Sequence, residues 1–161
     1  MECVKKAIET GQPLRQKSGQ LLEVELPQAQ SLMMNGDKNR VARAVEQLLD
    51  NAAKFCPSGT AIALQCKALG SDAFEVTVAD QGPGVPEFAR SRIFDPFYQA
   101  DGSPTRAQGG TGVGLAVARG VARGHGGDLV LSPRALTMGG KTYQGACFVF
   151  TVKARGDSIA S

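Results

Sequence analysis

The sequence predicts an α+β domain, a two-layer sandwich in which a mixed, largely antiparallel sheet carries helices on one face. The chain has 161 residues, which suits a single domain. Hydrophobic residues make up 42% and charged residues 20%, a balance typical of a packed core. The hydrophobic periodicities predict these elements in chain order: helix, strand, helix, strand, strand, loop, helix, strand, strand. Because this order is neither strict alternation nor an all-β list, helices gathered on one face of a sheet are the expected layout.

Composition excludes several classes of function. The net charge of +3 is too small to predict a nucleic-acid surface or a membrane anchor. No apolar run approaches the ~18 residues of a membrane span. Cys3, Cys56, Cys66 and Cys147 lie far apart and the chain has one histidine, His125, so we expect buried free thiols rather than a zinc site. A Ser-His-Asp triad would have to use His125.

The first half of the chain predicts an arm, a strand and a long helix. Residues 1–20 read as a short helical arm. Residues 22–26 alternate apolar and charged side chains, as a half-buried strand does, and Pro27 ends them. From Asp37, a plausible cap, apolar residues recur at helical spacing to Phe55, and Pro57 stops the helix.

The second half predicts two hairpin-like pairs of strands around a glycine-rich region. Residues 61–68 and 74–79 read as strands joined by a turn at 70–72. Residues 112–124 read as a helix, and 129–131 and 146–152 as strands with a turn around Gly139-Gly140. Nine of the 20 glycines lie between Gly102 and Gly127, so function is expected there. Residues 154–161 are expected to form a frayed tail.

The helix at 38–55 carries one polar edge. At ~100° per residue, Gln47, Asn51 and Lys54 fall together, with Arg43 beside them. Amide oxygens suit Mg²⁺ and an ammonium suits a phosphate. A solvated helix face is the alternative. Glu46 lies ~140° from Asn51 on this wheel, and we expect it to face solvent rather than to act as a base.

A carboxylate follows the strand at 74–79, in Asp80-Gln81-Gly82-Pro83-Gly84. An aspartate at a strand end, beside backbone that glycine leaves open, suits the amino group of a purine. An ordinary Asp-x-Gly turn is the alternative.

Gly109-Gly110-Thr111-Gly112-Val113-Gly114-Leu115 runs directly into a helix. Backbone N–H groups that converge at a helix N-terminus favour phosphate, so the stretch predicts a phosphate cradle, with a purely structural glycine turn as the alternative. It matches neither the P-loop nor the Rossmann fingerprint. Before it, residues 92–98 and the polar stretch 99–108 suggest a lid in which Arg106 could reach a phosphate.

Together these stretches resemble the catalytic and ATP-binding domain of sensor histidine kinases, in the superfamily with the Bergerat-type ATP-binding fold that includes gyrase, a heat-shock chaperone and the mismatch-repair ATPase. Residues 46–55 resemble the asparagine box, 80–84 the first glycine box, 94–97 the phenylalanine box and 110–115 the second glycine box. The likeness covers residues 20–152, and it implies an ATP-binding catalytic domain at 21–153.

The resemblance implies roles for individual residues. Asn51 would help to coordinate Mg²⁺, Lys54 and Arg106 would meet phosphates, and Asp80 would accept from the adenine amino group. The implied contacts to ATP are Gln47, Asn51, Lys54, Asp80, Gly82, Gly84, Phe94, Phe97, Arg106, Gly110, Thr111, Gly112, Val113, Gly114 and Leu115. One position departs from the family: Gln47 stands where these kinases usually have Asn and the hydrolysing relatives Glu. A glutamine keeps a carbonyl ligand for Mg²⁺ but cannot activate water as a glutamate does, which favours a kinase over an ATPase.

The implied function is a protein-histidine kinase module with ATP and Mg²⁺ as cofactors. His125 is a poor phosphoacceptor, so we expect the acceptor histidine on a dimerisation domain outside this chain, with a response regulator as the further partner. We expect no nucleic-acid partner and no direct membrane contact, and a cytoplasmic location within a parent protein that could be membrane-tethered. Two alternatives stay open: an anti-sigma-type serine kinase or partner-switching protein, and a degenerate nucleotide-binding scaffold.

Overall fold

The computed structural model describes residues 2–10, 19–26, 38–69, 73–95 and 114–153, and these form one α+β layer structure. The elements in chain order are α1 (Glu2–Thr10), β1 (Leu21–Glu25), α3 (Lys38–Phe55), β2 (Ala61–Leu69), β3 (Ala73–Asp80), the 3₁₀ turn η1 (Glu87–Ala89), α4 (Gly114–Gly124), β4 (Asp128–Leu131), β5 (Leu136–Met138), β6 (Lys141–Tyr143) and β7 (Cys147–Lys153).

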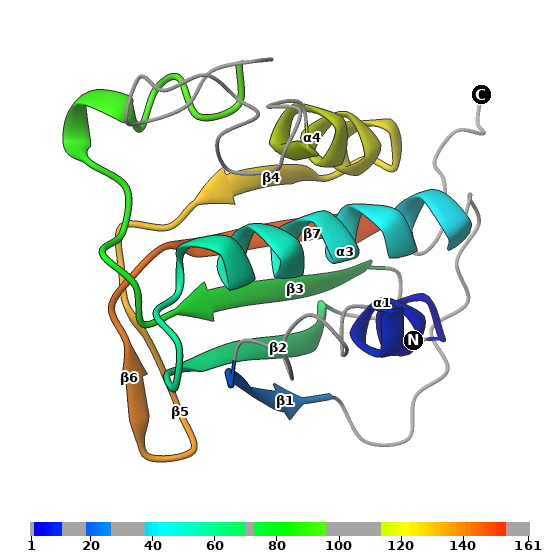
Figure 1. Cartoon of the computed structure of the whole chain (residues 1–161). Helices are drawn as coiled ribbons and strands as arrows, with labels where there is room; N and C mark the ends of the chain where they lie inside the picture. The colour runs from blue at the N-terminus through cyan, green and yellow to red at the C-terminus, as the bar shows by residue number, and fades with distance from the viewer. Residues whose placement is uncertain (1, 11–18, 27–37, 70–72, 96–113, 154–161) are drawn as a thin grey trace, which may run out of the picture.

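The main sheet has five strands in the order β1-β2-β3-β7-β4. β1 pairs parallel with β2, whereas β2 with β3, β3 with β7, and β7 with β4 pair antiparallel. Figure 1 shows α1, α3 and α4 on the same side of this sheet. The predicted fold class, a mixed and largely antiparallel sheet with helices on one face, is therefore confirmed.

The main core lies between the sheet and the helices. Alternate strand residues such as Ile62, Leu64, Val76 and Phe150 turn towards it, as the two-residue period of a strand requires. α3 contributes its apolar face, with Val41, Val45, Leu48, Leu49 and Ala52 buried. Val4 and Ala7 of α1 are fully buried in the same core, so this helix is an integral part of it. The domain boundaries at 20/21 and 153/154 stay predictions.

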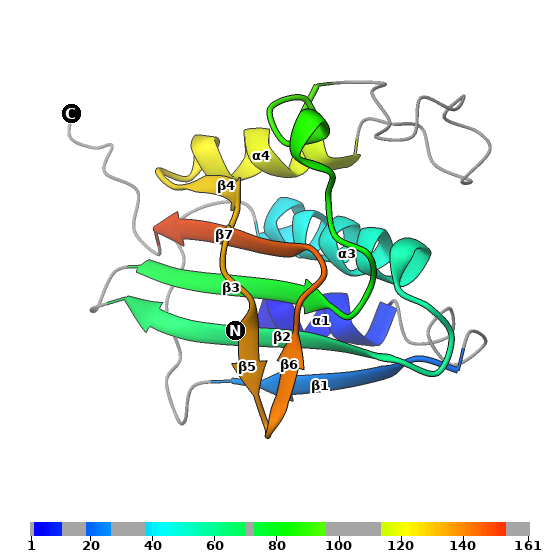
Figure 2. The same cartoon turned by 90° about the vertical axis from the view of Figure 1, so that its left-hand side faces the viewer.

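The hairpin β5–β6 covers part of the other face and was not predicted. Sequence reasoning placed only a turn at Gly139-Gly140, which the structure confirms, with φ of +61° and +79° at the two glycines. The short flanking strands pair with each other, and Met138 and Tyr143 pack on Ala61, Ala79 and Cys147 in a second, smaller core. Figure 2 shows the hairpin running across the strands towards β1.

An ion pair joins this hairpin to the edge of the sheet. Lys141 Nζ lies 2.6 Å from Oε1 of Glu23 in β1, and this hydrogen bond lowers the pKa of Glu23 despite some desolvation. Burial, and then the negative charge of Glu23, raise the pKa of Tyr143 to about 12. The phenol is therefore neutral at physiological pH, and the hairpin presents no phenolate beneath the sheet.

The cysteines agree with the expected thiols as far as they are described. Cys56, Cys66 and Cys147 are buried thiols that form no disulfide within the described residues, and the side chain of Cys3 lies outside those residues. Within the described helices, none is both long and apolar enough to span a bilayer.

Candidate functional site

α3 presents the predicted polar edge. Gln47, Asn51 and Lys54 are spaced by four and three residues, so they lie on one face of the helix. Gln47 and Lys54 are exposed and Asn51 is half-buried, whereas Leu48 and Leu49 point into the core. Glu46 was predicted to face solvent and this is wrong in part, because its side chain is half-buried.

Asp80 is the last residue of β3 and its side chain is only 3% exposed. Its Oδ1 accepts hydrogen bonds from the backbone N–H of Gly82 at 2.9 Å and of Ala146 at 3.2 Å. Among the described residues, no hydrogen bond reaches Oδ2. One carboxylate oxygen is therefore fixed by the backbone, and the other is left to accept from a ligand.

The environment of Asp80 acts on its acidity in two opposing ways. Burial is the larger effect and raises the pKa of the carboxyl group, while the N–H groups of Gly82 and Ala146 lower it. The net pKa is raised above the ordinary aspartate value. A buried, weakly solvated carboxylate is a stronger acceptor than one in water, which suits recognition of an N–H group.

Gly82 packs the turn after Asp80 directly onto the end of α3. A Cβ on Gly82 would lie 2.6 Å from the carbonyl oxygen of Phe55 and 3.1 Å from Asp80 Oδ1. A side chain would thus displace either the helix end or the carboxylate. Gly84 has φ of +79°, a conformation that disfavours other residues.

Gly145, which sequence reasoning missed, closes the other side of Asp80. Its N–H donates to the carbonyl oxygen of Asp80 at 2.8 Å. A Cβ there would clash with Asp80 Oδ1 and lie 2.7 Å from Gly82 N. The available signal was a glycine immediately before a predicted strand, outside any turn, which often marks close backbone approach.

Gly114 brings the start of α4 against α3. It is the first residue of α4, and a Cβ on it would meet Oε1 of Gln47. The contact of Gly82 with Phe55 lies eight residues further along α3, or ~12 Å at 1.5 Å per residue. The structure therefore brings one glycine of each motif, Gly82 and Gly114, against the same helix, and Asn51 and Lys54 lie between the two points of contact along α3.

Gln20 is a second residue that sequence reasoning missed. Its Nε2 donates to the carbonyl oxygens of Ala53 at 2.9 Å and Cys56 at 2.7 Å, which caps the C-terminal end of α3. This end carries Lys54 and Phe55. Gln20 precedes β1, and no periodic pattern in the sequence indicates that its side chain caps the later helix α3.

Several predicted residues lie outside the described part of the chain, so their placement stays a prediction. They are Phe97, Arg106, Gly110, Thr111, Gly112 and Val113. Leu115 is half-buried and packs against the main core. Phe94 meets Phe148 edge to face, with ring centroids 6.2 Å apart.

The side-chain oxygens on the polar edge of α3 suit a hard cation that is also coordinated by a bound ligand. Within the described residues, no group of three or more His, Cys, Asp or Glu side chains could hold a metal ion. The carbonyl oxygens of Gln47 and Asn51, one helical turn apart, are the hard ligands that the site offers. Mg²⁺ is commonly held by few protein oxygens together with water and substrate phosphates, so these residues fit that ion.

Fold and site together define a class, a nucleotide-binding catalytic domain in which a buried carboxylate at a strand end is followed by a turn that packs on the end of a helix with amide and amine side chains. Comparison with known families agrees. The chain belongs to the family described as "Histidine kinase-, DNA gyrase B-, and HSP90-like ATPase", whose model matches residues 36–156.

Within this family, the individual relatives indicate the ATPase catalytic domain of histidine kinases. The signal transduction histidine-protein kinase/phosphatase MprB of Mycolicibacterium smegmatis is 42% identical over 94 residues, which are 58% of this chain and 19% of that protein. A structure of the mycobacterial sensor histidine kinase MprB superposes with a TM-score of 0.76 at 28% identity, covering 96% of this chain and 95% of the other. Full-length ShkA, solved in complex with AMPPNP, gives 0.74 at 26% identity, covering 96% of this chain and 30% of that one.

The resemblance found in the sequence is thereby confirmed, and the partner-switching and scaffold alternatives are not favoured. The chain spans about a fifth of the length of the MprB relative that it matches.

Proposed function

We propose that this domain binds Mg-ATP and presents its γ-phosphate to a histidine on a separate dimerisation domain of a two-component sensor kinase. The observation that carries the proposal is Asp80, buried at the end of β3 with one oxygen fixed by two backbone N–H groups and the other left to accept. In this proposal Oδ2 accepts from the adenine amino group, while Gly82, packed on the end of α3, and Gly84, with its positive φ, shape the turn beside the base.

The other end of the nucleotide would lie along α3 towards α4. Lys54 would pair with phosphate oxygens, and the open N–H groups at the start of α4, beside Gly114, would face the phosphates as well. Gln47 and Asn51 would hold Mg²⁺, which neutralises phosphate charge when bound. The further contacts of Phe97, Arg106, Gly110, Thr111, Gly112 and Val113 belong to the same proposal.

The reaction needs no covalent residue on this chain. An imidazole nitrogen of the acceptor histidine attacks the γ-phosphorus, the bond to the β-phosphate oxygen breaks, and ADP leaves. We infer a cytoplasmic location from the need for ATP. A response regulator would then take the phosphoryl group. The complex of full-length ShkA with AMPPNP supports the nucleotide step by analogy.

Calorimetric titration with AMPPNP, with and without Mg²⁺, tests the proposal. We expect saturable one-to-one binding that is weakened about tenfold or more when Mg²⁺ is omitted, because the phosphate charge is then uncompensated. Asn51→Ala serves as the metal-side variant and should lose most of the Mg²⁺ effect. Absence of binding up to millimolar AMPPNP would contradict the proposal.

Lowering the pH should weaken ATP binding while it increases the contribution of Asp80 to the free energy of unfolding. Burial raises the pKa of Asp80 in the folded state above its value in the unfolded chain, so the folded state binds this proton more tightly. The contribution of Asp80 to the free energy of unfolding therefore falls as pH rises from the unfolded towards the folded pKa. Affinity for ATP should rise over the same interval, because the ionised form is the acceptor.

Thermal unfolding of the ligand-free chain and ATP titration, both followed against pH, measure the two effects. The Asp80→Asn variant is the control for unfolding and should lack the component that belongs to this group. If ATP affinity and the component of stability that Asp80→Asn removes changed in the same direction through the interval, Asp80 would not be the titrating acceptor.

A further inference from the structure

Arg119, in the second turn of α4, makes two contacts at once. Its Nε donates to Oδ1 of Asp128, at the start of β4, over 3.1 Å. Its guanidinium carbon also lies 4.5 Å from the centroid of the Phe94 ring, within the range of a cation–π contact. The side chain is 29% exposed, so both contacts are partly shielded from water.

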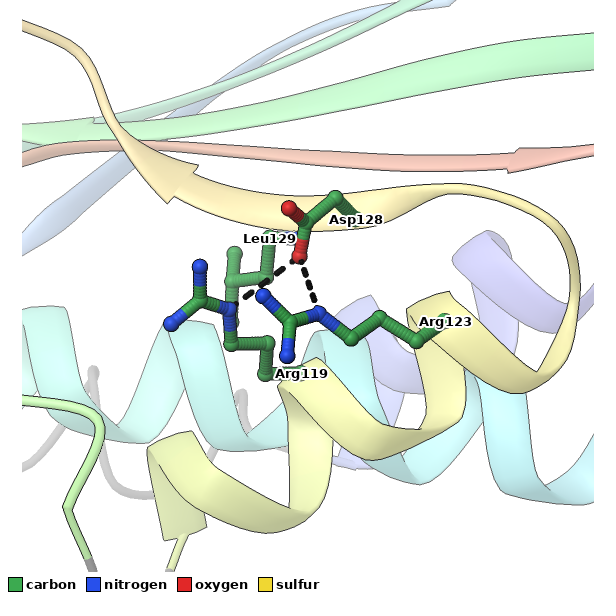
Figure 3. Close-up of polar contacts among 4 residues, drawn as sticks. All are labelled: Arg119, Arg123, Asp128 and Leu129. Atoms are coloured by element: carbon green, nitrogen blue, oxygen red, sulfur yellow. Dashed lines mark hydrogen bonds and ion pairs between the residues drawn. The ribbon is translucent and has the colours of Figure 1, made fainter.

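Arg123 provides an internal comparison. It lies one turn further along α4 and donates from Nε to the same oxygen of Asp128 at 3.0 Å. Figure 3 shows the two arginines converging on this carboxylate from successive turns. Desolvation raises the pKa of Asp128, but the hydrogen bonds from Arg119, Arg123 and the Leu129 N–H outweigh it, so the net pKa is lowered. Arg119 contacts an aromatic ring, whereas Arg123 has no such contact within the described residues.

Phe94 is held on its other side by β7. Its ring meets Phe148 at an interplanar angle of 85°. Phe148 pairs with Val78 in β3, and Ala146, two residues earlier on the chain, donates to Asp80. Phe94 therefore connects α4 to the strands that hold the carboxylate of the candidate site.

Free space lies beside this ring. A pocket of about 300 Å³ is lined by Phe94 and Arg119 together with Arg90, Ser91, Val130 and Leu131. Close packing alone does not confine the ring on that side, since there is room for it to move. Phe94 packs on the main core, and beside the pocket the contact with Arg119 adds a restraint that holds the ring against Phe148.

We propose that Arg119 is a positioning residue of the nucleotide site, in which Asp128 fixes the guanidinium and the guanidinium holds Phe94 in place. This inference rests on the proposed function, because it assigns the consequence of a displaced Phe94 to ATP binding. Without the restraint, the start of α4 and the Asp80 end of the sheet lose a shared contact.

The geometry calls for arginine in particular. A planar guanidinium can donate from Nε in its own plane to Asp128 while its central carbon lies over the Phe94 ring. An ammonium is a point charge on a flexible stem and makes one of these contacts at a time. Lysine at position 119 should therefore fail to restore the function of arginine.

ATP titration of three variants tests the proposal. Arg119→Met and Arg119→Lys should each weaken ATP binding about tenfold. Arg123→Met, the matched control, removes an ion pair with the same carboxylate and should change the affinity less than about twofold. Equal effects at 119 and 123, or full affinity in Arg119→Lys, would overturn the proposal.

A second measurement needs no nucleotide. The Phe94 ring should shift the Nε–H resonance of Arg119 upfield in the ¹H–¹⁵N spectrum of the free protein, and Phe94→Leu should abolish this shift. Loss of the shift in Phe94→Leu with an unchanged Arg123 resonance supports the contact, and an unchanged Arg119 resonance refutes it. If the parent chain binds no ATP, the proposed function fails, and these spectra decide separately whether Arg119 holds Phe94.

Discussion

Asp80→Asn should weaken ATP binding about 100-fold or more while leaving the fold intact. The backbone N–H groups of Gly82 and Ala146 both point at Oδ1, so the amide oxygen of asparagine would be held in that position. The amide NH₂ would then stand where Oδ2 stands in the parent. A donor would face the amino group of adenine, which is itself a donor, so the variant loses an acceptor and gains a repulsive contact.

The same argument predicts a change in base preference. Inosine triphosphate carries a carbonyl oxygen at the position of the adenine amino group, and this oxygen can accept from the new NH₂. We expect the ratio of ATP to inosine triphosphate affinity to fall below one in Asp80→Asn, measured by calorimetry for both nucleotides. Parent-like ATP affinity in a folded Asp80→Asn variant would show that Asp80 does not contact the base.

Gly145→Ala should remove ATP binding and lower the free energy of unfolding by about 1–3 kcal/mol. The added methyl would clash with Asp80 Oδ1 and would lie 2.7 Å from Gly82 N and 2.8 Å from the Asp80 carbonyl oxygen. Two of these neighbours are backbone atoms, which cannot rotate away. The site and the strand end must therefore shift together.

Gly120→Ala is the matched control for Gly145→Ala. Gly120 lies within α4, and a Cβ there would meet nothing within 4 Å. Because alanine favours a helix over glycine, this variant should be more stable by about 1 kcal/mol and should bind ATP unchanged. Chemical denaturation and ATP titration of both variants check the pair, and parent-like binding by Gly145→Ala would show that the close approach at Asp80 is not required.

Local patterns predicted the elements that carry most of the candidate site. α3 was identified because its apolar positions recur at helical spacing until Pro57, and β2 and β3 because each is a compact apolar run flanked by turn residues. Gln47, Asn51 and Lys54 follow from the helical wheel alone. Asp80 follows from its place at a strand end before two glycines.

Non-local contacts explain what could not be predicted. The partners of Asp80 include Ala146, 66 residues away, and those of Gln20 are carbonyl groups 33 and 36 residues away. The strands β5 and β6 have three residues each, too short to show a period. The glutamine at position 47 could be seen in the sequence, but its contact with Gly114 depends on how α4 packs on α3.

The position of β7 in the sheet sets an order of assembly. β7 is the last strand within the described residues, yet it lies between β3 and β4. During synthesis, β4 therefore emerges before the neighbour that attaches it to the sheet, and β3 waits with one edge unpaired. Since Ala146 directly precedes β7, the carboxylate of Asp80 acquires its second backbone donor only once β7 has paired with β3, so a nascent chain without β7 lacks part of the proposed base-recognition site.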